Sequence, residues 1–113
     1  MDKVYTLTMA GNTWAVDCPK VTYSADATIE PNVYNDFGTI DGTRTITKGT
    51  EKPYVVNIYI IRFTAGAGCA IELNGWSCKW AGGNVPAYTE GKVYEISIID
   101  DLAMYVEGSV QTL

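Results

Sequence analysis

The sequence predicts an all-β fold, an antiparallel β-sandwich or jelly-roll-like single domain, and three observations support this prediction. Residues that favour strands dominate, with 10 Val, 10 Ile and 13 Thr against 4 Leu. Apolar and polar residues alternate along several segments, as they do in half-buried strands. Turn-forming residues recur roughly every eight to twelve positions, a spacing typical of sandwiches and jelly rolls. With 113 residues, the chain is long enough for one domain and too short for two.

The N-terminal part, residues 1–28, is expected to form strands and to act as a docking segment. Residues 4–9 and 13–17 lie on either side of Gly11-Asn12, a turn-forming dipeptide, and together they predict a β-hairpin. Two short extended pieces follow. Their residues are 21–23 and 27–29.

The middle of the chain predicts a strand entry, two strands and a bulge. Pro31 marks the entry or an edge, because proline has no N–H to donate to a ladder. Residues 33–37 and 43–47 flank Asp41-Gly42, a dipeptide suited to positive φ, and Gly38 indicates a further kink or bulge.

The most hydrophobic segment covers residues 54–63 and follows a polar connection. We expect it to lie centrally in a sheet, because near-continuous apolar runs belong to strands that are buried on both faces. An apolar strand of this kind also predicts burial between subunits and therefore a homo-oligomer.

Asn74-Gly75 is the strongest hairpin signal in the chain, since this dipeptide favours a type I′ turn. A hairpin centred there places three cross-strand pairs on one face: Leu73 with Trp76, Ile71 with Cys78, and Cys69 with Trp80. Cys69 and Cys78 would then sit diagonally, too far apart for an unstrained disulfide. The chain has three cysteines, an odd number, and we expect them to stay reduced.

The C-terminal part predicts a second hairpin. Residues 92–99 alternate, with Tyr94, Ile96 and Ile98 on one side, and residues 102–106 return after Asp100-Asp101. The spacing of Ile98, Leu102 and Tyr105 also fits a helix, but the β-branched neighbours favour the hairpin. Residues 108–113 are expected to be a loose tail.

Charge and composition exclude most function classes. The net charge of −5 repels phosphate backbones and anionic lipid headgroups, so neither nucleic acid nor a membrane is an expected partner. No signal-peptide pattern opens the sequence, which predicts synthesis in the cytoplasm. The absence of histidine removes the usual general base, the common nucleophile pairs and the commonest metal ligand. We therefore expect no enzyme.

Two arrangements of carboxylates are candidates for a catalytic acid pair. Asp100-Asp101, or Asp36 with Asp41, could supply the acid pair of a glycosidase, but adjacent aspartates favour turns. Residues 35–41 hold only part of a calcium loop. The glycine clusters lack the helix and lysine of a phosphate-binding loop. The sequence therefore predicts no catalytic residue, no metal and no cofactor.

Aromatic residues divide into a predicted core and a few surface candidates. The core is expected to contain Trp76, Trp80, Tyr94, Ile96 and Ile98. Three aromatic residues remain as weak candidates for stacking on sugar rings. They are Trp14, Tyr88 and Tyr105.

Four short motifs occur in an order and spacing that resemble a module of bacteriophage virion proteins. The motifs are EPNVYNDFG at 30–38, IRFTAG at 61–66, KWAGGNVP at 79–86 and GKVYEISI at 91–98. The proteins that carry this module are tail-fibre, head-fibre and other capsid or baseplate appendage proteins of phages and prophages of gut bacteria. The resemblance spans roughly residues 29–107.

This resemblance implies a small β-sandwich displayed on the virion, often as a trimer, which binds another virion protein or touches the host. It also implies that Trp80 and residues 94–98 are structural. The chain departs from the module between Ile40 and Val56, where it is more polar. Residues 1–28 precede the module, and we expect them to form no fibre shaft. We therefore expect a capsid decoration, short head-fibre or fibre-tip subunit. The alternative is a glycan-binding module that recognises a host receptor.

Overall fold

The structure is a computed structural model that describes residues 3–9, 12–83 and 86–107; for residues 3–18 only the backbone is described. The all-β prediction is confirmed, since the described part contains eleven strands, one 3-10 turn and no α-helix. The strands are β1 (Lys3–Met9), β2 (Asn12–Cys18), β3 (Lys20–Thr22), β4 (Ala27–Ile29), β5 (Tyr34–Ile40), β6 (Thr43–Lys48), β7 (Ile58–Ala65), β8 (Ala70–Asn74), β9 (Lys79–Trp80), β10 (Val93–Ile99) and β11 (Leu102–Glu107). The 3-10 turn η1 covers Ala81–Gly83. Over the described ranges, no helix is long and apolar enough to cross a membrane.

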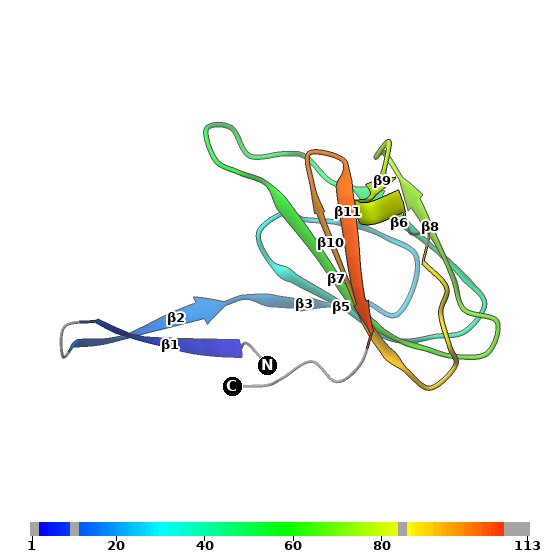
Figure 1. The fold of residues 1–113 in the computed structure, drawn as a ribbon, viewed down its shortest axis with the longest axis horizontal. Coiled ribbons are helices and arrows are strands. Elements are labelled where there is room, and N and C mark those ends of the chain that lie inside the picture. The colour runs from blue at the N-terminus through cyan, green and yellow to red at the C-terminus, as the bar shows by residue number, and fades with distance from the viewer. Residues whose placement is uncertain (1–2, 10–11, 84–85, 108–113) are drawn as a thin grey trace.

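Strands β3 to β8 alternate between two sheets, so the chain coils like a short solenoid (Figure 1). The larger sheet has the order β3-β5-β7-β10-β11-β9, and the smaller one the order β4-β6-β8. Each strand of the coil runs parallel to the strand two places earlier. The prediction of an antiparallel fold is therefore wrong for this region. The strands pair in parallel because each short link carries the chain to the opposite sheet instead of turning it back beside the strand it has just left.

The antiparallel part lies at the C-terminal end. β10 pairs antiparallel with β7 and with β11. Asp100 and Asp101 form the two-residue turn between β10 and β11, with φ of 48° and 64°. Both positive φ values are those that a type I′ hairpin turn requires, and aspartate tolerates them. The hairpin is confirmed over the helix.

The hairpin predicted at Asn74-Gly75 is wrong. β8 pairs with β6, whereas β9 pairs in parallel with β11 on the other sheet. Gly75 does turn the chain, with a φ of 99°, but the turn leads across the core. Tertiary packing overrides the local preference here, because Trp76 packs edge-on against Tyr59 with ring centroids 5.2 Å apart.

One hydrophobic core lies between the two sheets. β7 points Tyr59, Ile61, Phe63 and Ala65 inward, and β10 adds its own alternate residues Tyr94, Ile96 and Ile98. The smaller sheet contributes Ile29 and Ile46 to the same cluster. The central position predicted for the hydrophobic segment is confirmed, since β7 lies between β5 and β10.

β7 begins at Ile58 and not at residue 54, because polar side chains hold the preceding segment as a loop. Asn57 donates to the carbonyl oxygens of Lys52 and Val55, and its own Oδ1 accepts the Lys52 N–H. The Asn32 side chain accepts the N–H of Ile58 at 3.0 Å. Residues 54–56 are consequently exposed.

Two smaller predictions can be compared with the backbone. The bulge at Gly38 is confirmed, because the β5–β7 register shifts between Asp36 and Thr39. The N-terminal hairpin is confirmed as the β1–β2 ladder, in which Asn12 pairs with Met9 and so belongs to the strand. This ladder is a separate two-stranded sheet that extends away from the two-sheet body (Figure 1). The predicted tail at 108–113 lies outside the described residues.

Candidate functional site

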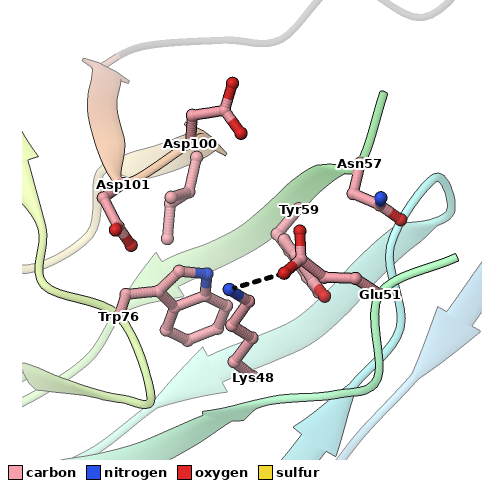
Figure 2. A pocket seen from close by; sticks show the side chains of 8 residues that line it. Lys48, Glu51, Asn57, Tyr59, Trp76, Asp100 and Asp101 are labelled. Atoms are coloured by element: carbon pink, nitrogen blue, oxygen red, sulfur yellow. Dashed lines mark ion pairs between the residues drawn. The ribbon is translucent and has the colours of Figure 1, made fainter. Parts of the chain in front are cut away.

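A polar pocket opens at the end of the body where β7 begins and β10 ends (Figure 2). Its volume is about 200 Å³. The lining side chains are mainly polar or aromatic, and they come from both sheets and from the loop before β7. They are Lys48, Glu51, Asn57, Tyr59, Trp76, Ile98, Asp100 and Asp101.

Close backbone packing between two neighbouring strands of the smaller sheet shapes one side of this pocket. Lys48 is the last residue of β6, and Gly75 packs beside it after β8. A Cβ atom at position 75 would lie 3.0 Å from Lys48 Cβ, and the φ of 99° is one that side chains disfavour. Glycine at position 75 therefore allows Trp76 to reach the pocket wall.

The charged groups of the pocket are held by specific partners. Lys48 Nζ lies 3.2 Å from Glu51 Oε1, and this hydrogen bond raises the pKa of Lys48. The Ser77 N–H donates to Asp101 Oδ1 at 3.2 Å, and the Lys79 N–H donates to the Asp101 carbonyl oxygen at 2.7 Å. The Asp101 turn thus fixes the segment that follows Trp76.

Tyr59 forms the floor between these charges. Its hydroxyl donates to the carbonyl oxygen of Gly49 at 2.9 Å. Burial raises the pKa of Tyr59, so the phenol stays neutral at physiological pH. The side chain supports the ring of Trp76 and does not serve as a base.

Trp76 is the one lining residue with a buried donor that lacks a protein partner. The side chain is 9% exposed, and its Nε1 atom is fully buried and donates no hydrogen bond to any described residue. Figure 2 shows the nitrogen-bearing edge of the indole pointing into the pocket, as does the Lys48 ammonium. The ring is part of the core, and its buried N–H faces the pocket.

The pocket offers both hydrogen-bond acceptors and hydrogen-bond donors. Glu51, Asp100 and Asp101 are acceptors, and Lys48 and Trp76 are donors. Among the residues that the structure describes, no group of three or more His, Cys, Asp or Glu side chains is arranged to hold a metal ion. Asp100-Asp101, weighed from the sequence as an acid pair, forms the β10–β11 turn.

The other carboxylates that the sequence singled out have structural partners. Asp36 pairs with Lys20 at 3.2 Å and accepts the Gly38 N–H. Asp41 accepts the N–H of Ala67. The partial calcium loop at 35–41 is therefore a strand with a bulge, and its Asn35 side chain donates to three backbone carbonyl oxygens.

Tyr88 and Tyr105, two of the predicted sugar-stacking candidates, lie in an aromatic cluster. Tyr88 packs edge-on against Phe63 and Tyr94 with centroid distances of 5.2 and 5.0 Å. Tyr105 packs edge-on against Trp80 at 6.1 Å. Both are half-buried, and burial raises the pKa of Tyr88 far above its ordinary value. Neighbouring rings therefore occupy much of the surface that a sugar would need.

The remaining residues that the sequence singled out differ in their burial. Trp76, Tyr94, Ile96 and Ile98 are buried, and Trp80 is half-buried. Trp14 lies on β2, and its side chain is outside the described part of the structure. Cys69 and Cys78 are free thiols, as expected, and burial raises the pKa of each.

Sequence reasoning missed the pocket itself. In the sequence, Lys48 and Glu51 belong to a polar connection and Tyr59 to a central strand, and no pattern brings the three together. Only the Asp100-Asp101 turn carried a local signal for one wall of the site.

Comparison with known proteins finds no matching family model, no matching curated protein and no matching solved structure.

Proposed function

We propose that the chain is a non-enzymatic structural protein of a bacteriophage virion: a capsid decoration, head-fibre or tail-fibre-tip subunit. It is made in the bacterial cytoplasm and acts on the virion by binding other virion proteins. The resemblance of residues 29–107 supplies the virion context, and the two sheets would act as a β-sandwich scaffold. The observation that supports binding is an apolar surface on the outer face of the larger sheet.

This outer apolar face is built from alternate residues of three neighbouring strands. Leu102, Met104 and Val106 on β11 are 51%, 50% and 65% exposed, while Ala103 between them is buried. The register sets Ile99 of β10 beside Leu102 and beside Ile58 of β7. The face comprises Ile58, Ile60, Ile99, Leu102, Met104 and Val106.

Polar groups of the central strand β10 interrupt this apolar surface. Glu95 lies beside Val106 on β11 and beside Arg62 on β7, and it accepts a hydrogen bond from the Tyr34 hydroxyl. Ser97 of β10 lies between Ile60 and Met104, so the face combines apolar residues with polar ones, as protein interfaces commonly do. Contiguous exposed apolar surface of this kind commonly marks an association site.

The same face suits self-association, and we propose a homo-oligomer with a trimer favoured. The β1–β2 hairpin, which pairs with no other described strand, is a second segment suited to docking on a virion partner. The net charge of −5 disfavours nucleic acid and anionic membranes as partners. A host-surface glycan remains the alternative ligand, as expected for a receptor-binding module.

Cosedimentation with empty capsids and with tail fractions of the encoding phage tests this proposal. We expect the wild-type protein to sediment with one of these particles and Met104→Lys to remain in the supernatant. The matched control is Thr45→Lys, a lysine on the smaller sheet, which should sediment like the wild type. Binding to host cells with no binding to any virion fraction would contradict the structural role and support the receptor-binding alternative.

A further inference from the structure

The unpartnered indole N–H of Trp76 indicates what the polar pocket binds. A buried donor without an acceptor destabilises the folded protein. Trp76 bears this cost while its ring packs well against Tyr59. Because the nitrogen edge faces the pocket, a ligand that displaces the side chains covering this buried atom can accept the hydrogen bond (Figure 2).

The charges around Trp76 restrict the class of ligand. Three carboxylates and one ammonium line the pocket, and the ammonium of Lys48 is already paired with Glu51. An anion would satisfy the Trp76 donor but would be repelled by Asp100 and Asp101. A simple ammonium ligand would suit the carboxylates, yet it has no acceptor for the indole N–H.

Hydroxyl groups satisfy both requirements, because each one donates one hydrogen bond and accepts others. We propose that this pocket binds an uncharged polyhydroxyl ligand, a single neutral saccharide unit. Trp76 Nε1 donates to one ligand hydroxyl oxygen. The carboxylates of Asp101 and Glu51 accept hydrogen bonds from other hydroxyls of the ligand.

The size and rigidity of the pocket agree with a small ligand. Its volume of about 200 Å³ is below the ~300–1,000 Å³ of pockets for drug-sized molecules and equals several waters at ~30 Å³ each. Ser77 holds the Asp101 carboxylate, and Lys48 holds Glu51, so both acceptors are preorganised. This inference is independent of the virion role, since the pocket is complete within one chain.

The test is a titration of the ¹⁵N-labelled protein, in which each tryptophan indole N–H gives its own NMR signal. The probes are neutral hexoses, 6-deoxyhexoses and N-acetylhexosamines, with glucuronate and spermidine as anionic and cationic comparisons. We expect at least one neutral sugar to shift the Trp76 indole signal saturably while the Trp14 and Trp80 signals stay in place. Trp76→Phe identifies the Trp76 signal.

Variants then separate the two kinds of hydrogen bond. Asp101→Asn keeps the positive φ that asparagine tolerates and keeps an acceptor for Ser77, and we expect it to weaken binding about tenfold. Trp76→Phe, followed by the backbone signal of Ser77, should weaken binding about fivefold. Glu72→Gln, on the exposed face of β8 away from the pocket, is the matched control and should bind as the wild type does.

Several outcomes would overturn the inference. They are no saturation by any neutral sugar up to about 100 mM, binding of glucuronate or spermidine in preference to the sugars, and a shift confined to Trp14 or Trp80. Unchanged affinity in both Asp101→Asn and Trp76→Phe would overturn it as well. None of these results bears on whether the chain sediments with virion particles.

Discussion

The two sheets share one core, but the outer surface of the smaller sheet is polar and that of the larger sheet is largely apolar. On the smaller sheet, the outward positions carry threonines, Glu72 and Asn74, and the register sets Thr45 beside Glu72 and Thr47 beside Asn74. On the larger sheet, the outward positions of β7, β10 and β11 carry the outer apolar face together with the polar residues Arg62, Glu95 and Ser97. A polar face is stable in water without a partner, whereas removing the apolar face from water is favourable in free energy.

This contrast between the two outer surfaces shows that the fold alone does not require apolar residues on both faces of the larger sheet. The inward residues of β7 already fill the core with Tyr59, Ile61 and Phe63. We therefore propose that the residues of the outer apolar face act in association, and the substitutions below separate this role from core packing.

The largest effect is expected from the inward face of β7. Ile61→Ala removes a fully buried side chain that both sheets cover, and we expect the free energy of unfolding to fall by about 2–5 kcal/mol. Urea denaturation followed by tryptophan fluorescence measures it. Ile60→Ala is the control on the outward face of the same strand. At low protein concentration it should cost less than about 1 kcal/mol, and equal losses would deny that the two faces differ.

The close contact between Gly75, after β8, and Lys48, at the end of β6, gives the next effect. Gly75→Ala combines an unfavourable φ of 99° with a contact of 3.0 Å to Lys48, so we expect a loss of about 1–3 kcal/mol. Gly68→Ala shares a positive φ but meets open space, and its loss should be smaller, about 1 kcal/mol. Thermal unfolding of the two variants compares them. A greater loss for Gly68→Ala would show that the close approach to Lys48 is unimportant.

The aromatic cluster predicts a small effect that is confined to alkaline pH. Burial raises the pKa of Tyr88 above the value of 10.0 for an unperturbed tyrosine. The unfolded state therefore ionises first, and the stabilisation from this group is present below pH 10 and lost as the pH rises above it. Tyr88→Phe removes the ionisable group, so its free energy of unfolding should decline less steeply above pH 10 than that of the wild type. Identical pH profiles would contradict the buried position of this phenol.

Much of the fold was predictable from local patterns, because the deciding interactions are close in sequence. The alternation of Tyr94, Ile96 and Ile98 predicted β10, and Asp100-Asp101 predicted the turn to β11. The positive φ at Gly42 and the bulge at Gly38 follow from residue type alone. Each of these features depends on neighbours within a few positions.

The parallel coil and the pocket could not be predicted in this way. Asn74-Gly75 carries the same local preference whether the next strand folds back or crosses to the opposite sheet. The burial of Trp76 against Tyr59, 17 positions earlier, decides between these two paths. The pocket depends on long-range pairing as well, since Trp76 and Lys48 meet there only because β8 lies beside β6.

The central claim is that the outer apolar face of the larger sheet is an association surface. Native mass spectrometry across a range of concentrations tests it most directly, with wild type, Met104→Lys and Thr45→Lys compared side by side. We predict an assembly of three 12.3 kDa chains for the wild type and for Thr45→Lys, and a monomer for Met104→Lys. A wild-type monomer at every concentration, or an assembly that Met104→Lys leaves intact, would contradict the claim.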